Sequence, residues 1–205
     1  MHHINKTIVA AMSRLVANKD STTGRHLGRA ARTLGVLIKG LLKLDLYTDE
    51  LNMLDLNLIV ESSQLHDIGK IAIHDDILLK RGKLTADEYE LMKKHVEQGV
   101  KIIEDIHPGT HENEFLAYAR EMIATHHEKW NGSGYPNNLA GEEIPLCGRL
   151  MAIADVYDAL ISERPYKKAF PHKTAIRIIE ESGGIHFDPL IAEAFPEIIS
   201  GAMHK

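Results

Sequence analysis

Apolar residues recur every three or four positions along most of the chain, which is the spacing of one face of an α-helix. The stripe formed by Leu27, Ala30, Leu34, Leu37 and Leu41 is the clearest example. Runs that alternate apolar and polar residues are almost absent, so any strand is expected to be short. The pattern therefore predicts a single all-α domain over residues 1–205, with about seven helices.

Capping residues and helix breakers suggest where the helices begin and end. Thr85 followed by Glu88 is a capping-box signature, and Asp188-Pro189 is typical of a cap and first turn. Pro145 and Pro171 suit first helical positions. Three polar stretches, 71–83, 129–145 and 162–171, are expected to be irregular. The expected helices cover approximately 4–15, 27–41, 50–68, 85–103, 113–128, 146–161 and 171–183, with a last helix from 189.

Composition narrows the class of protein. With 44% hydrophobic and 26% charged residues the chain reads as soluble and globular. A net charge of −5 argues against a basic DNA-binding surface. No segment approaches the roughly 18 apolar residues of a membrane helix, and the start lacks a secretion-signal profile. The single cysteine, Cys147, cannot form an internal disulfide. We therefore expect a cytoplasmic protein without membrane insertion or DNA binding.

Several of the thirteen histidines, and two aspartates, occupy positions where the helical pattern calls for a core residue. Taken singly, each has a structural explanation, such as a hydrogen-bonded core histidine or a helix cap. Taken together they require a shared partner, because burying unpaired polar groups is costly and a metal ion would satisfy them all. These residues are His26, His66, Asp67, His95, His126, His127 and Asp155.

The chemistry of these side chains narrows the metal. Histidine and aspartate without thiolate suit iron, manganese or zinc, and disfavour calcium. Seven ligands are too many for one ion with an open position, and the two oxygens of Asp67 could bridge two ions. Two ions about 3.5–4 Å apart would activate a bridging hydroxide and hold a phosphate during in-line displacement. We therefore predict two divalent metal ions per chain.

Several short motifs, in a fixed order, resemble those of the HD-GYP subgroup of the HD phosphohydrolase superfamily, the bacterial cyclic di-GMP phosphodiesterases. His66 and Asp67 open one of them, and the resemblance covers nearly the whole chain. The motifs are TGRH at 23–26, HDIGK at 66–70, HHE at 126–128, GSGYP at 132–136, ADVYDAL at 154–160, RPY at 164–166 and GIHFDP at 184–189.

The resemblance implies an all-helical HD-type domain with two or three ions, usually iron or manganese, that hydrolyses cyclic di-GMP to pGpG and often onward to GMP. It assigns the same seven metal ligands. It implies that Lys70 acts in catalysis with Asp67, that Arg164 and Lys167 hold substrate phosphates or guanine, and that Gly134 and Tyr135 shape the pocket rim. Members with three metals carry a glutamate where Thr22 stands here, so two ions are expected.

Two other functions stay open at this point. The domain could sense cyclic di-GMP, or dock onto a GGDEF-type cyclase, without hydrolysing anything. It could also be an HD hydrolase of another cyclic dinucleotide. The complete ligand set together with Lys70 favours the enzyme, and the GYP-type loop favours cyclic di-GMP. The resemblance further implies a sensory domain or a GGDEF-type cyclase as partner, and it leaves self-association open.

Overall fold

A computed structural model describes the backbone of residues 2–19, 21–106, 113–163 and 168–203, and the side chains of these ranges except 2–6, 21–25 and 203. The described residues form helices joined by turns and loops, and their extended pairings are isolated bridges from Asn131 to Ala140 and from Gly183 to Phe187. The all-α expectation is confirmed. The α-helices are α1 (His2–Lys19), α2 (Ser21–Lys43), α3 (Thr48–Asn52), α4 (Leu56–Ser62), α5 (Asp75–Leu78), α6 (Ala86–Lys93), α7 (His95–Ile106), α8 (Glu114–Thr125), α9 (Leu146–Ile161), α10 (His172–Glu181) and α11 (Pro189–Met203).

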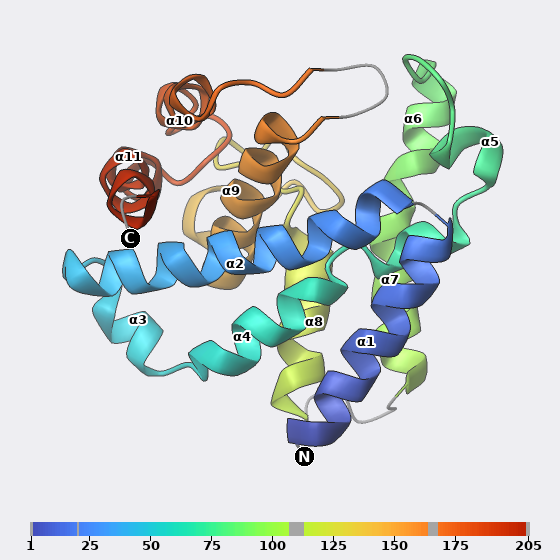
Figure 1. Ribbon diagram of the computed structural model, residues 1–205, viewed down its shortest axis with the longest axis horizontal. Helices are drawn as coiled ribbons and strands as arrows, with labels where there is room; N and C mark the ends of the chain where they lie inside the picture. The colour runs from blue at the N-terminus through green and yellow to red at the C-terminus, as the bar shows by residue number, and fades with distance from the viewer. Residues whose placement is uncertain (1, 20, 107–112, 164–167, 204–205) are drawn as a thin grey trace.

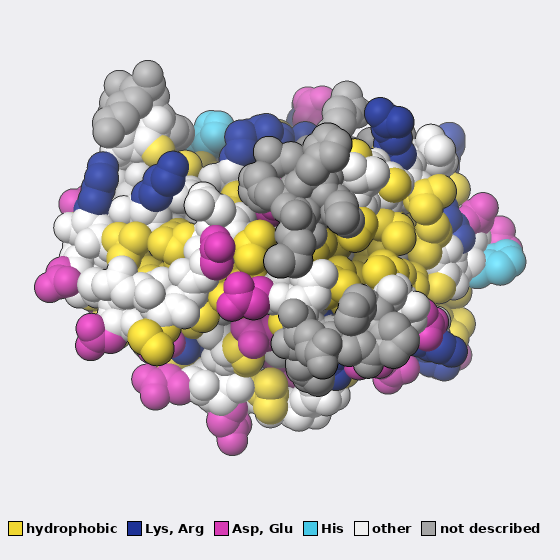
Figure 2. Space-filling view, turned by 90° about the horizontal axis from the view of Figure 1, so that it is seen from below, with side chains coloured by type: hydrophobic (Ala, Val, Ile, Leu, Met, Phe, Trp, Pro, Cys, Tyr) yellow, Lys and Arg dark blue, Asp and Glu magenta, His cyan; other side chains and the backbone are white. Residues whose placement is uncertain are grey.

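Helix α2 is the central element. It contacts α1, α4, α9 and α11, and Figure 1 shows it crossing the molecule with α10 and α11 near one end and α5 and α6 beyond the other. Helix α7 packs against α8 and against the 3-10 turn η2 (Ile68–Ala72). Seen from below, hydrophobic side chains form a band across one face, bordered by charged residues (Figure 2). None of the described helices combines the length and the hydropathy needed to cross a bilayer.

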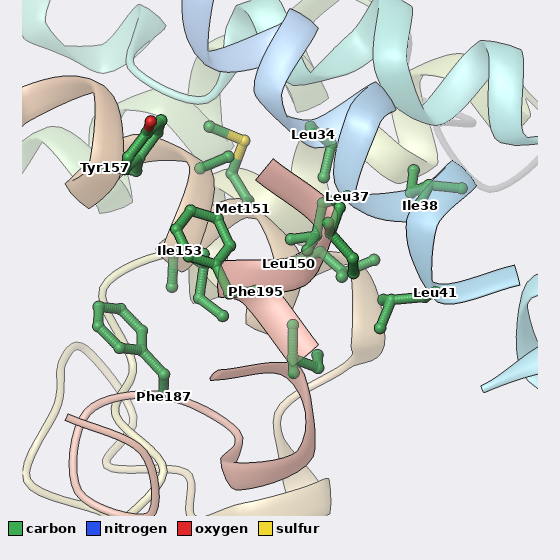
Figure 3. Close-up of a cluster of buried hydrophobic side chains, with 14 of the residues drawn as sticks. Leu34, Leu37, Ile38, Leu41, Leu150, Met151, Ile153, Tyr157, Phe187 and Phe195 are labelled. Carbon is green, nitrogen blue, oxygen red and sulfur yellow. The ribbon is translucent and has the colours of Figure 1, made fainter. Parts of the chain in front are cut away.

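The apolar stripe on α2 forms the centre of the larger core, as the periodicity predicts. Leu34, Leu37 and Leu41 are fully buried and belong to one cluster with Leu150 of α9 and Phe195 of α11 (Figure 3). A second cluster of buried side chains joins α1 to α7 and α8. Burial of this kind contributes about 1.5–3 kcal/mol for each large apolar side chain. The two clusters hold α2, α7, α8 and α9 in fixed relative positions.

The capping residues predicted from the sequence lie at the ends of observed helices. Thr85 and Glu88 form the expected capping box: Thr85 Oγ1 accepts from the Glu88 amide, and Glu88 Oε2 accepts from the Thr85 amide at 2.7 Å. Asp188 Oδ1 accepts from the amide of Leu190 at 3.0 Å, so it caps α11 as expected. Pro145 and Pro171 each stand one position before the first helical residue rather than at it.

Two expected helices are each broken in two. The helix expected over 50–68 is interrupted because the Asp55 side chain accepts from the amides of Asn57 and Leu58, both at 3.0 Å, and starts α4 afresh. Helix α4 then tightens into the 3-10 turn η1 (Ser63–Leu65). The helix expected over 85–103 breaks at Lys94, between α6 and α7. The stretch 71–83, expected to be irregular, contains the short helix α5.

Gly69 permits the closest backbone approach near these breaks. A Cβ atom at Gly69 would lie 1.8 Å from the His95 carbonyl oxygen and 2.5 Å from the Gly99 amide nitrogen. Both are backbone atoms, so neither can rotate away. A glycine is therefore required for η2 to pack on the first turns of α7.

We expect Gly69→Ala to lower the free energy of unfolding by about 2 kcal/mol or more, because the added methyl group overpacks two backbone segments. Urea denaturation followed by circular dichroism measures this loss. Gly28→Ala in α2 is the matched control, since a Cβ there meets only the flexible end of Arg32 at 3.8 Å. This control is expected to be neutral or to stabilise by up to about 1 kcal/mol. Equal stability of both variants would contradict the packing argument.

Candidate metal centre

Five separate segments bring the seven predicted ligands together. His26 lies on α2, Asp155 on α9, and His95 begins α7. His66 and Asp67 lie between η1 and η2, while His126 and His127 directly follow α8. The break at Lys94 and the 3-10 turn η1 therefore fall directly before ligand positions, His95 and His66.

The ligand atoms form two groups that share one residue. One atom from each of Asp67, His95, His126 and His127 lies within 4.8 Å of the others, and the same holds for His26, His66 and Asp67. Asp155 joins the second group, since its Oδ1 lies 2.9 Å from His26 Nε2 and 3.9 Å from His66 Nε2. Asp67 thus stands between the two groups.

Backbone carbonyls orient three of the histidine rings. In each case Nδ1 lies within hydrogen-bond distance of a carbonyl oxygen, which can only accept, so Nδ1 carries the proton. The Nε2 atom therefore presents a lone pair, as metal-ligating histidines do. The bonds run from His66 to Ser63 at 2.7 Å, from His95 to Met92 at 2.8 Å, and from His126 to Met122 at 2.9 Å.

Four buried atoms of this centre lack a hydrogen-bond partner among the described residues: Nε2 of His66, His95 and His126, and Oδ1 of Asp67. All four are electron-pair donors, and Asp67 Oδ1 lies 3.5 Å from His95 Nε2 and 3.9 Å from His126 Nε2. Buried polar atoms are rarely left unsatisfied. Lone pairs facing one another are satisfied by a cation, so this donor set fits divalent metal.

The protonation states agree with this role. Burial lowers the pKa of His95 and of His126 to about 4, and burial also lowers the pKa of His66 and of His127. These rings are therefore neutral near pH 7, the form that binds metal. Burial opposes ionisation of Asp67, but the adjacent Lys70 ammonium and the surrounding imidazoles hold the pKa of its carboxyl well below the usual range.

His26 differs from the other histidines because carboxylates flank both of its ring nitrogens. Its Nε2 lies 2.9 Å from Asp155 Oδ1, and its Nδ1 lies 2.6 Å from Asp158 Oδ2. Burial opposes protonation, but the hydrogen bonds to the two carboxylates outweigh it and raise the pKa of His26 to about 9. His26 is thus protonated at neutral pH in the metal-free protein, and ligation through Nε2 would release a proton.

The sequence analysis missed Asp158, the carboxylate that contacts His26 Nδ1. Asp158 is buried, and Arg29 donates to its two oxygens at 2.6 and 2.9 Å. Arg29 also donates to Ser162 Oγ at 2.8 Å. A signal was present, since Asp158 follows Asp155 by three positions and Arg29 follows His26 by three, which places each pair on one helix face. Arg29 and Asp158 therefore orient the His26 ring.

Lys70 lies at the edge of the centre, beside Asp67. Its Nζ lies 2.5 Å from Asp67 Oδ2, and 24% of its side chain is exposed. The lysine therefore contacts Oδ2 of Asp67, which also lies 3.6 Å from His66 Nε2, while Oδ1 faces His95 and His126.

The loop after α8 forms one rim of the centre. Glu128 is buried and accepts from the amides of Asn137 at 2.7 Å and Leu139 at 3.1 Å, which closes the loop. A Cβ at Gly134 would lie 2.3 Å from the Lys129 amide nitrogen, so only glycine fits there. The following residue, Tyr135, stacks on His127 with ring centroids 4.7 Å apart.

Three predicted positions fall outside this description. Arg164 and Lys167 lie outside the described residues. Thr22 belongs to α2, one turn before His26, but its side chain is among those the structure does not describe.

We expect Asp158→Asn to lower the affinity for divalent metal by about 10- to 100-fold, because the His26 ring loses its charged hydrogen-bond partner. Titration with Mn²⁺ against a chelating indicator measures the affinity, and circular dichroism checks the fold. Ser162→Ala removes a neighbour of Asp158 that does not contact His26, and its effect should be smaller. Unchanged metal affinity in Asp158→Asn would show that the ring needs no such support.

Comparisons with known proteins place the chain in a family. A model described as "HD domain" matches residues 11–191. A "Cyclic di-GMP phosphodiesterase" of Vibrio cholerae is 47% identical over 189 residues, which cover 91% of this chain and 38% of that relative. A "3'3'-cGAMP-specific phosphodiesterase 2" of the same organism is 37% identical over 203 residues, covering 96% of this chain and 35% of the relative.

The solved structure of a cyclic GMP-AMP-specific phosphodiesterase from V. cholerae aligns with a TM-score of 0.63 at 19% identity, over 95% of this chain and 48% of that one. At this identity the likeness shows a shared fold. This chain spans less than half the length of each of these three proteins. Since the HD domain model covers most of the chain, including all seven residues of the histidine–aspartate centre, the chain belongs to the HD domain family.

Proposed function

We propose that this chain is a metal-dependent phosphodiesterase that hydrolyses cyclic di-GMP to pGpG. The observation that carries the proposal is the set of four buried, unpartnered lone-pair atoms on His66, Asp67, His95 and His126, with the Lys70 ammonium beside Asp67. A relative that is 47% identical is named a cyclic di-GMP phosphodiesterase, which supports the choice of substrate.

Two divalent ions per chain agree best with the arrangement of ligands. One ion would be held by Asp67, His95, His126 and His127, and the other by His26, His66, Asp67 and Asp155, with the carboxylate of Asp67 shared. Nitrogen and oxygen ligands without thiolate suit iron or manganese, and zinc is also compatible. Such a pair of ions supplies Lewis acidity, which polarises a phosphodiester and activates water.

The chain's own residues would bind the substrate and stabilise charge. Lys70 carries its ammonium beside Asp67, where it can neutralise negative charge on the reacting phosphate or protonate the departing 3′ oxygen. Arg164 and Lys167 follow α9 in the sequence and are proposed to hold the substrate's other phosphate or a base. Gly134 and Tyr135 form the rim that limits access to His127.

A second candidate substrate is 3'3'-cGAMP, because a relative that is 37% identical over most of this chain is named as specific for it. The same centre would serve both substrates, since the two molecules carry identical phosphodiester linkages and differ in one base. Metal-loaded protein incubated anaerobically with each dinucleotide separates the two candidates, and formation of pGpG identifies the first. Binding without any product would identify a sensor instead.

We expect Asp67→Ala to abolish turnover of cyclic di-GMP and to empty both metal positions, because this carboxylate belongs to both ligand groups. Elemental analysis of protein reconstituted with manganese or iron measures the loss. The unaltered chain should hold two ions, and three tightly bound ions would contradict the proposed stoichiometry. Asp49→Ala, an exposed aspartate on α3, is the control. Near-normal metal content and turnover in Asp67→Ala would overturn the mechanism.

We expect Lys70→Ala to lower kcat by about a hundredfold while the ions stay bound. The substitution removes the ammonium that would lie beside the reacting phosphate, and it leaves the metal ligands in place. Steady-state kinetics and elemental analysis on the same preparation measure both quantities. Lys83→Ala changes an exposed lysine in the loop between α5 and α6 and should behave like the unaltered chain. A variant that loses turnover only in proportion to lost metal would assign Lys70 a structural role.

A further inference from the structure

Helix α6 places an aromatic ring and an ion pair beside the rim of the metal centre. Tyr89 and Lys93 lie one turn apart, and the Lys93 Nζ is 5.2 Å from the centroid of the Tyr89 ring and 5.4 Å from that of Tyr135. The Tyr89 and Tyr135 rings meet edge to face at 6.5 Å, and Tyr135 in turn stacks on His127. Glu90 completes the group, with its Oε1 at 2.6 Å from Lys93 Nζ.

Core packing does not explain this group, because α6 contributes no buried residue. The helix is held by its capping box and by the ion pair between Lys80 and Glu88. Tyr89 is 48% exposed, and the side chains of Glu90 and Lys93 are 66% and 28% exposed. These three side chains are therefore available to a molecule that lies across the rim.

The donors and acceptors of this group match the edge of one nucleobase. Guanine presents the O6 acceptor next to the N1–H and N2–H donors. An ammonium can donate to O6, and a carboxylate can accept from two adjacent donors at once. A tyrosine face offers the stacking surface that bases prefer. Adenine carries an amino group in place of O6 and no amino group at C2, so it would lose both polar interactions.

We propose that Tyr89, Glu90 and Lys93 form a guanine-binding subsite, in which Tyr89 stacks on the base, Lys93 donates to O6, and Glu90 accepts from N1–H and N2–H. The inference rests on the proposed function, because a cyclic dinucleotide bound with a phosphate at the metal centre carries a base on each side of it. A mixed GMP-AMP dinucleotide would still be accepted, since it can present its single guanine.

The test compares three substrates of the metal-loaded full chain: cyclic di-GMP, cyclic di-AMP, and the base-free bis(p-nitrophenyl) phosphate. Lys93→Met and Glu90→Gln should each lower kcat/KM for cyclic di-GMP about tenfold, chiefly through a higher KM. The preference for cyclic di-GMP over cyclic di-AMP should shrink by a similar factor. Lys94→Met, which changes the exposed lysine next to Lys93, is the matched control and should keep the preference.

Two kinetic results would overturn the subsite. Equal losses on cyclic di-GMP and on bis(p-nitrophenyl) phosphate would mean that Lys93 acts by positioning Tyr135 and His127. Unchanged kinetics with cyclic di-GMP would mean that the rim does not meet the base. If the unaltered chain hydrolyses no substrate, the proposed function fails, and calorimetric affinity for cyclic di-GMP then tests the subsite alone. In that measurement, a tenfold weaker affinity of Lys93→Met and of Glu90→Gln for cyclic di-GMP supports the subsite, and an affinity equal to that of the unaltered chain rejects it.

Discussion

The buried carboxylate of Asp67 is the group around which the rest of the centre is arranged. Removing an anion from water is costly unless positive charge compensates it. Lys70 compensates one oxygen, while the other faces the lone pairs of His95 and His126 and finds no hydrogen-bond donor among the described residues. Without a cation this arrangement would combine a buried charge with repelling lone pairs. The arrangement of these donor atoms is therefore that of a site for a divalent cation.

The ligands are held by outer contacts of three different kinds. Backbone carbonyls fix the rings of His66, His95 and His126. A charged pair, Arg29 with Asp158, fixes His26, and this pair ties the start of α2 to the end of α9. His127 is held by stacking on Tyr135, so its position depends on the loop after α8 and, through Lys93, on α6. Tyr135 thus links the proposed base-binding residue Lys93 to the proposed metal ligand His127.

Breaks in the helices bring ligands from distant parts of the chain together. A continuous helix from 50 to 68 would carry His66 and Asp67 along its own axis, whereas the caps and 3-10 turns direct them toward α7 and α8. The close approach of Gly69 to the His95 carbonyl completes this turn. The positions of His66 and Asp67 therefore depend on the 3-10 turns around them and on the close packing at Gly69.

Much of this protein can be inferred from its sequence. Helical periodicity determined the all-α class and the inward stripe of α2, because burial repeats with the period of the helix. The position of polar residues on those stripes selected the residues of the centre, because such side chains need a shared partner. The Asp55 cap that starts α4 is local, and helical periodicity alone does not reveal it. The break at Lys94, the pairing of Arg29 with Asp158, and the contact of Tyr89 and Lys93 with Tyr135 were decided by the tertiary structure. These features arise between segments distant in sequence, where packing and the pairing of buried charges override local propensity.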